Sequence, residues 1–414
     1  MSAGICIMNK NAVALAADSA VTVGNRLAIY NTANKIFALS KIAPIGAIMY
    51  SNVNLMDVPM EIVLGLFKEK IGNTVFNSLE DCVNSFLRSI IEEKSLFKFE
   101  QNEKQLVLNI CSNVLRNMNI LTKIGKNVLE RKLSTDDLKQ IEEDCMQRIE
   151  KNILKQTSQI ENSVQQYIYD SYLIDIKNCI MEHMTYADNE QIEHFASFLC
   201  LNFDKLLFQT GYTGLVFAGY GEQEIFPQMI HIHIFGIINN VVCYFIKGRQ
   251  CITGDNPSSI APLAQEDVMH TFLFGINNSY IDYINKEIRQ KIEKCINDME
   301  DDLFAQDAKC LIQNKLLDST NELIQNVAQT AQTNYFKPIM QSITALPIHD
   351  LALLAESMIN ITSLRRKIAL DGNTGTVGGP VDVAIITKYD GFVWIKRKHY
   401  FDKNWNLQNF SIKQ

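Results

Sequence analysis

Residues 13–24 read Val-Ala-Leu-Ala-Ala-Asp-Ser-Ala-Val-Thr-Val-Gly, and this stretch decides the fold. Val13 and Leu15 alternate with alanines, which is typical of a β-strand. Asp18 follows two alanines at the point where this strand is expected to end. An earlier apolar run ends at Asn9-Lys10-Asn11, which is a typical turn sequence. The chain is therefore predicted to begin with two strands joined by a tight turn.

Short apolar runs continue beyond this hairpin. Residues 35–39 and 45–50 are rich in Ile and Ala and fit two further strands. Asp57-Val58-Pro59 is typical of a helix start, because proline suits the first helical turn. That helix is expected to end just before Gly72-Asn73, which would break it.

Residues 74–212 differ in composition from the segments on either side. The chain has only 8 prolines, and none lies between Pro59 and Pro227. Apolar residues recur there at helical spacing, with Gln, Glu, Asn and Lys between them. Ser134 or Thr135 is expected to cap one helix, because a hydroxyl oxygen can accept a hydrogen bond from the first turn. This segment is therefore predicted to be a block of helices.

Strands are predicted to return after this block and again near the end of the chain, with helices between them. A loop is expected at 254–259, followed by a helix that begins near Ala264. The expected strands span 214–220, 228–235, 241–247, 381–387 and 392–396, and helical segments span 280–345 and 350–367. The last helix is expected to bury a stripe formed by Leu351, Leu354, Ala355, Met358 and Ile361.

This order of elements predicts a layered α+β domain, because strands at both chain ends flank the central helices. The predicted core has three parts, at 1–73, 213–279 and 346–414. Helical insertions are predicted at 74–212 and 280–345.

The composition excludes several classes of function. The chain has 414 residues, of which 47% are hydrophobic and 21% are charged, as in ordinary globular proteins. Its net charge of −7 provides no basic field for nucleic acid, and no apolar run approaches the ~20 residues that span a bilayer. The N-terminus lacks a signal-peptide pattern, and the ten cysteines, from Cys6 to Cys310, form no CxxC pair. Reduced thiols and a cytoplasmic location are expected.

Ser2 is the candidate nucleophile. A small second residue permits removal of Met1, which would leave a free α-amine beside the Ser2 hydroxyl. The α-amine has a reference pKa of about 7.7–8.0, so it can take the hydroxyl proton near neutral pH. Such a site needs a nearby cation to keep the amine neutral and an anion to hold that cation. Lys35 and Asp18 are the available candidates in the early strands.

These residues resemble the start of mature proteasome β subunits, which belong to the N-terminal-nucleophile (Ntn) hydrolases. In that family a nucleophilic Thr begins the mature chain, an Asp ends the second strand and a Lys begins the third. Ser2, Asp18 and Lys35 match these positions, with Ser in place of Thr and one inserted residue before Lys35. Segments 217–228 and 377–384 resemble the family's middle strand pair and its Gly-Gly step into the last strands.

The resemblance implies a four-layer αββα sandwich with large helical insertions. It also implies amide or peptide hydrolysis at Ser2, with Lys35 and Asp18 as the other catalytic residues. The oxyanion donor would be a backbone N–H after the fourth strand, at Met49, Tyr50 or Ser51, and Tyr50 is our first choice. The family usually assembles into rings, so a homo-oligomer is expected, and no metal or organic cofactor is required.

The Gly-Gly step departs from the family pattern. The family has an Asp three residues before a Ser, and this chain has Thr374 and Val377 at those places. Two side chains that support the α-amine in the family are therefore missing, and Thr376 is a candidate substitute.

Other functions fit the same sequence. A catalytically silent scaffold would bind a partner protein through the insertions, and the missing support for the α-amine favours it. A small-molecule amidase would use the same nucleophile. Peptide or amide substrates are expected, whereas nucleic acid and membrane are not. His231 and His233 share one strand face, as metal ligands can, but an ordinary strand face is preferred because the sequence offers no third ligand.

Overall fold

The computed structural model describes most of the chain, and Ser2, Thr374 and Thr376 lie outside the described residues. The described residues are 3–23, 28–93, 96–97, 99–128, 134–156, 160, 163–209, 211–298, 306–368 and 377–399.

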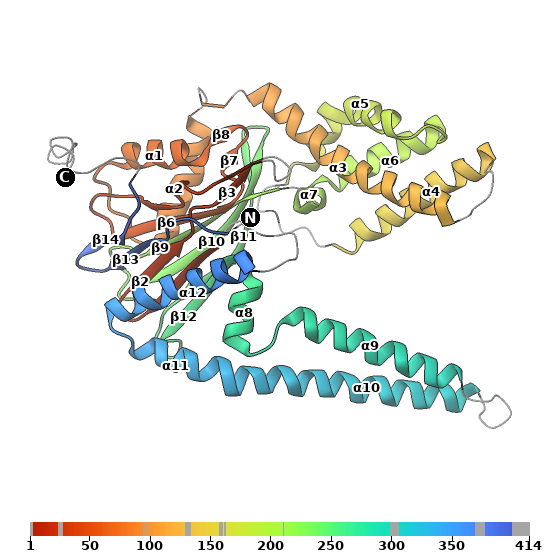
Figure 1. Cartoon of the computed structure of the whole chain (residues 1–414). Helices are drawn as coiled ribbons and strands as arrows, with labels where there is room; N and C mark the ends of the chain where they lie inside the picture. The colour runs from red at the N-terminus through yellow and green to blue at the C-terminus, as the bar shows by residue number, and fades with distance from the viewer. Residues whose placement is uncertain are drawn as a thin grey trace.

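Two five-stranded antiparallel sheets lie at the centre of the molecule and pack face to face on a shared hydrophobic cluster (Figure 1). The first has the order β12-β1-β2-β13-β14, and the second has the order β11-β10-β9-β6-β5. The first consists of β12 (Ser258–Ala264), β1 (Ala3–Asn9), β2 (Val13–Ala17), β13 (Asp382–Thr387) and β14 (Gly391–Lys396). The second consists of β11 (Val241–Cys251), β10 (Gln228–Ile238), β9 (Thr213–Gly219), β6 (Ile45–Ser51) and β5 (Ile36–Ala38). Two small strand pairs are β3 (Val21–Val23) with β4 (Ala28–Tyr30), and β7 (Asn54–Leu55) with β8 (Val58–Pro59).

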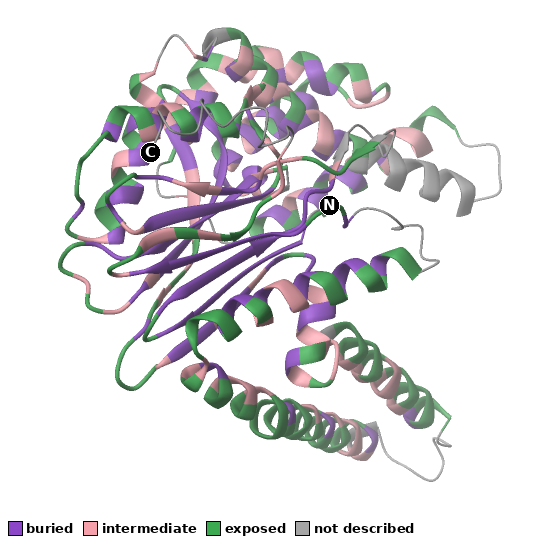
Figure 2. Cartoon of the chain, turned by 60° about the vertical axis from the view of Figure 1, so that its left-hand side comes forward, coloured by how far each residue is buried: buried purple, intermediate pink, exposed green. Residues whose placement is uncertain are grey.

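Alternation along the strands sends side chains into two different layers. On β2, Val13 and Leu15 lie in a cluster between the two sheets, together with Ile48 of the second sheet. Ala14 and Ala16 point the other way, into a cluster beneath the helices of the first sheet. Both sets are buried, so β2 is covered on both faces, as the purple strands of Figure 2 show.

Helices cover the outer faces of the sheets. α1 (Met60–Ile71) and α2 (Leu79–Glu92) pack on the second sheet, where the rings of Phe67 and Phe86 lie 5.3 Å apart. α12 (Ile348–Ile368) packs on the first sheet. The other helices beside the first sheet are α8 (Glu266–Phe274) and α11 (Lys337–Ala345), which follows the π-helical segment Gln332–Phe336. Helices and antiparallel sheets are therefore combined as the α+β prediction requires.

The helical segment between β8 and β9 continues beyond α2 and has a second hydrophobic core, which also includes Phe235 and Ile238 of β10 and Cys243 of β11. Its helices are α3 (Phe99–Val128), α4 (Thr135–Leu154), α5 (Gln165–His183), α6 (Asn189–Leu201) and α7 (Phe203–Leu206), which the short 3₁₀ helix Leu207–Gln209 follows. Ser134 caps α4, as predicted, because its hydroxyl accepts the Asp137 N–H at 3.1 Å.

The second helical segment is a long hairpin of α9 (Asn278–Asn297) and α10 (Gln306–Ala331). Figure 1 shows that it extends from the sheets on the same side as the α3–α7 lobe. No helix in the described part of the chain is both long and apolar enough to cross a membrane.

The helix expected near Ala264 is present and begins at Glu266, because Ala264 still pairs with Ala3. Two other local expectations were wrong. The loop expected at 254–259 gives way at Ser258 to strand β12, which is the edge strand beside β1. On α12, Ile361 is 43% exposed and lies off the buried stripe. The sequence did not reveal strand β12 because it contains Pro262, which cannot donate a hydrogen bond to a neighbouring strand. Proline is tolerated there because β12 lies at the edge of its sheet.

Candidate active site

Asp18 joins three separate parts of the chain at one point. Its Oδ1 accepts the Ala3 N–H at 2.9 Å and the Lys35 ammonium at 2.5 Å. Its Oδ2 accepts the N–H groups of Gly378 at 3.0 Å and Ala20 at 3.2 Å. The Lys35 Nζ also donates to the carbonyl of Ala20 at 2.6 Å. The predicted partners Asp18 and Lys35 therefore meet beside Ala3, the residue that follows Ser2 in the chain.

The sheets explain why these groups meet. Asp18 directly follows β2, and Lys35 directly precedes β5 of the other sheet, so the ion pair spans the layer between the sheets. Gly378 arrives just before β13, which pairs with β2. Gly379 has a φ of 76°, and a Cβ there would lie 2.8 Å from the Asn31 carbonyl oxygen, so this tight approach requires glycine.

Burial sets the electrostatics of the pair. The Lys35 and Asp18 side chains are 2% and 0% exposed. Burial lowers the pKa of Lys35 from its usual value, and the attraction of Asp18 opposes that shift. Hydrogen bonds stabilise the Asp18 carboxylate, because it accepts three backbone N–H groups besides the Lys35 ammonium. A desolvated cation is therefore fixed near the start of β1.

Val377 occupies the place where the family pattern has a serine, and its side chain is fully buried in the apolar cluster beneath α12. The backbone next to it nevertheless contributes, since the Gly378 N–H holds Asp18 and the Gly378 carbonyl accepts the Ser19 N–H at 3.1 Å. Sequence reasoning missed this backbone role. The signal for it was the Gly-Gly pair itself, which permits close backbone contact.

Tyr50 lies near the end of β6, opposite Gly214 in the ladder with β9. Its phenol oxygen hydrogen-bonds to Nε2 of His231 and, at 2.7 Å, to Nε2 of His233. Burial raises the pKa of Tyr50 and lowers the pKa of His231 to about 3 and of His233 to about 4. Near pH 7 all three side chains are therefore neutral. Tyr50 was predicted only as a backbone donor, and the hydrogen bonds of its side chain to His231 and His233 were not expected.

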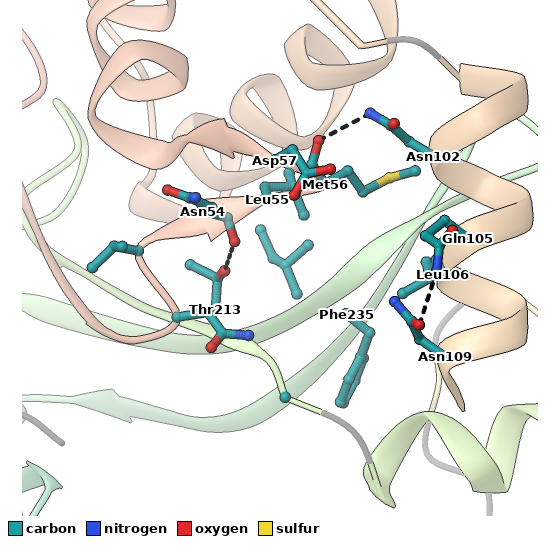
Figure 3. A pocket seen from close by; sticks show the side chains of 14 residues that line it. Asn54, Leu55, Met56, Asp57, Asn102, Gln105, Leu106, Asn109, Thr213 and Phe235 are labelled. Carbon is teal, nitrogen blue, oxygen red and sulfur yellow. Dashed lines mark hydrogen bonds between the residues drawn. The ribbon is translucent and has the colours of Figure 1, made fainter. Parts of the chain in front are cut away.

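A cavity of about 340 Å³ opens where β6 ends (Figure 3). One wall is the segment after Ser51, and the other is a face of α3. Polar side chains from both walls and from β9 line the cavity: Asn52, Asn54, Asp57, Asn102, Gln105, Asn109 and Thr213. Met56 and Asp57 have positive φ angles of 47° and 66°, an uncommon conformation that often occurs near ligand sites. The cavity presents both hydrogen-bond donors and acceptors.

Comparisons with known proteins found only distant likeness. No family model matches the chain, and no curated protein matches it. Among solved structures, a Gly-1 mutant of Anbu from Hyphomicrobium sp. strain MC1 is 10% identical, with a TM-score of 0.29, covering 100% of this chain and 96% of that one. Anbu (ancestral beta-subunit) from Yersinia bercovieri is 11% identical, with a TM-score of 0.28, covering 99% and 96%. Likeness at these scores does not show a family or a function for this chain.

Proposed function

We propose that this chain is an Ntn-type amide or peptide hydrolase, with a four-layer αββα core, whose nucleophile is Ser2 after loss of Met1. The observation that carries the proposal is the buried Lys35–Asp18 pair, which is hydrogen-bonded to the backbone of Ala3. A buried cation next to residue 2 is what an α-amine needs to stay neutral and act as a base.

The reaction would proceed in two halves. The Ser2 hydroxyl attacks the amide carbonyl while its own α-amine takes the hydroxyl proton. The tetrahedral intermediate then collapses, the C–N bond breaks, and the α-ammonium returns the proton to the leaving amine. Water next attacks the carbonyl carbon of the Ser2 ester while the α-amine takes a proton from the water. The C–O bond to Ser2 then breaks, the α-ammonium returns the proton to the Ser2 oxygen, and the acid is released. Lys35 stabilises the developing negative charge, and Asp18 positions Lys35.

We propose Ser51, rather than Tyr50, as the backbone oxyanion donor. The Met49 N–H donates to the Lys35 carbonyl at 2.8 Å, so it faces the β5 edge of the strand. Successive N–H groups of a strand point to opposite edges, so the Tyr50 N–H faces β9 and the Ser51 N–H faces the Lys35 side again. Ser51 also has a φ of 68°, which turns the chain at this point.

A second function, that of a silent scaffold, has one specific observation in its favour. The buried Val377 side chain supplies no hydroxyl at the Gly-Gly step. In that case partner proteins would bind the helical insertions, and the α9–α10 hairpin carries exposed apolar side chains such as Tyr280, Leu311 and Leu323.

Intact mass and a matched pair of variants separate these functions. Mass spectrometry of the untagged chain is expected to show loss of Met1. Ser2→Ala should abolish hydrolysis of a fluorogenic peptide panel, whereas Ser2→Thr, which keeps a hydroxyl, should retain it. A β-lactone probe should label residue 2 of the wild-type chain and leave Ser2→Ala unlabelled. Quantitative retention of Met1, or wild-type rates in Ser2→Ala, would contradict the mechanism and leave the scaffold function.

A further inference from the structure

A second buried ion pair joins the start of β13 to the segment that follows β14. Asp382 is the first residue of β13, and Lys398 lies in a basic run at 396–399. The Lys398 ammonium is bonded to Oδ2 of Asp382, and the Lys398 N–H donates to Oδ1 at 2.8 Å. The side chains of Asp382 and Lys398 are 5% and 10% exposed, whereas that of Lys396 is 54% exposed. Lys398 therefore turns inward from an otherwise basic surface segment.

Strand register places this pair beside the proposed catalytic centre. Asp382 pairs with Ala17 of β2, and Ala17 pairs with Gly4 of β1, so the three residues form one row across the first sheet. Ala17 and Ala384 lie in the cluster between the sheets, and Asp382, two residues before Ala384, shares that face. Neighbouring strands lie about 4.8 Å apart, so the backbone of Asp382 is roughly 10 Å from that of Gly4, which follows Ser2 by two positions. The pair is therefore within electrostatic range of an α-amine on Ser2.

Lys35 interacts electrostatically with both members of this pair as well as with Asp18. The repulsion by the Lys398 ammonium is larger than the attraction by the Asp382 carboxylate, so the positive end of the pair faces Lys35. Asp382 and Lys398 together carry no net charge, and their effect on a neighbouring group depends on this orientation. The pair therefore acts as a small dipole that opposes additional positive charge beside Lys35.

Two further charged side chains approach this region, and both are exposed. Glu61 of α1 accepts a hydrogen bond at 2.8 Å from Asn34, the residue before Lys35. Lys367 of α12 packs from the outer face of the first sheet, with its Cε 3.8 Å from the position that a Cβ on Gly378 would take. Water and salt screen exposed charges, so these two groups should affect the centre less than the buried pair does.

We propose that the Asp382–Lys398 pair lowers the proton affinity of an α-amine on Ser2 and that both are positioning residues for hydrolysis, an inference that rests on the proposed function. An α-amine acts as a base only while it is neutral, and a nearby positive charge disfavours its protonated form. The Asp18 carboxylate has the opposite effect, because it lies beside the backbone of residue 3 and attracts positive charge. The positive end of the second pair offsets this attraction.

A purely structural role is the alternative. Asp382 accepts both the N–H and the ammonium of Lys398, so the pair also fastens the segment after β14 to β13. Fastening alone predicts a loss of stability when the pair is removed, but no change in the protonation of residue 2. The two roles therefore differ in the pKa of the α-amine.

The test is titration of the α-amine in full chains that begin at Ser2, prepared with a cleavable tag whose protease leaves no extra residue. Trace acetylation by acetic anhydride from about pH 6 to 10, followed by mass spectrometry of the N-terminal peptide, gives the pKa without any hydrolysis. Lys398→Met leaves the Asp382 carboxylate unpaired roughly 10 Å away and should raise the pKa of the α-amine by about one unit. The double variant Asp382→Asn with Lys398→Met leaves no unpaired charge and should raise that pKa by about half a unit.

Two matched controls should keep the wild-type pKa. Lys398→Arg retains the positive charge beside Asp382. Lys396→Met removes a charge two residues away, from a side chain that is exposed. If the wild type hydrolyses a peptide substrate, the acidic limb of its kcat/KM profile should move to higher pH in Lys398→Met and in the double variant but not in the controls.

Each outcome decides the proposal. A raised pKa in the double variant, with both controls at the wild-type value, supports it. A double variant with the wild-type pKa, or an unchanged pKa in Lys398→Met, would overturn it and leave only the fastening role. If Lys398→Met does not fold, the double variant alone decides. A wild-type chain that shows these shifts but hydrolyses no substrate would contradict the proposed function and leave the effect of the pair on the α-amine standing.

Discussion

Two groups of polar side chains are buried in the layer between the sheets, and they are built on opposite principles. The Asp18–Lys35 pair is charged, and backbone N–H groups from three parts of the chain hold its carboxylate. The Tyr50–His231–His233 cluster is neutral near pH 7, and side-chain hydrogen bonds and ring packing hold it. A buried charge is strongly destabilising when its partner is removed, whereas a neutral cluster costs only its hydrogen bonds and packing. The first group should therefore be the more sensitive to substitution.

The largest expected effect is the loss of the Asp18 charge. Asp18→Asn leaves the Lys35 ammonium buried without its hydrogen-bonded anion, so we expect a loss of about 3–5 kcal/mol in the free energy of unfolding. Urea denaturation measures this quantity. The matched control is Asp175→Asn, which breaks the exposed Lys104–Asp175 pair at 2.8 Å and should cost less than about 1 kcal/mol. Similar costs for the two substitutions would show that the buried pair contributes no more than a surface pair.

A smaller effect is expected in the neutral cluster. In Gly214→Ala the new methyl group would lie 2.4 Å from the Tyr50 ring, which must then move away from His233. Overpacking of this kind costs about 1–3 kcal/mol, and thermal or urea unfolding would measure it. Gly248→Ala on β11 is the matched control, because a Cβ there meets nothing within 4 Å, and its stability should change by no more than about 0.5 kcal/mol. A cost at Gly214 equal to that control would mean that the Tyr50 ring position is not fixed.

The two clusters also differ in how far the sequence could predict them. Asp18 and Lys35 are 17 positions apart and sit at the ends of two recognisable strands. They were predicted as a pair because an N-terminal nucleophile needs a cation and an anion and because both match positions of the proteasome β family. Tyr50 and His231 are 181 positions apart, and their meeting depends on β9 lying between β6 and β10 in one register. Hydrophobic patterning predicted each of these strands but carries no information about their order in the sheet.

The same reasoning explains the boundary of the first insertion. Sequence composition changes at residue 74, so the helices after it were grouped together. In the structure α2 packs on the second sheet with α1, and the separate hydrophobic core begins only with α3. Apolar spacing shows that a helix has a buried face but does not say which layer covers that face. Helices on the outer faces of both sheets were therefore expected only from the resemblance to the proteasome β family.

The smallest expected effect is a change in the free energy of unfolding with pH, which arises from the burial of Lys35. Burial lowers the pKa of Lys35 below its usual value of 10.5, so between the folded and unfolded pKa the unfolded chain binds more protons. The free energy of unfolding should therefore rise with pH in that window, by at most about 1.4 kcal/mol per pH unit. Lys35→Met removes this titration but not those of other groups, so the difference between wild type and Lys35→Met should rise as the pH approaches 10.5 from below. A difference that falls over this range would mean that Asp18 raises the pKa of Lys35 more than burial lowers it, and the ion pair would then be held as a fully charged structural bridge.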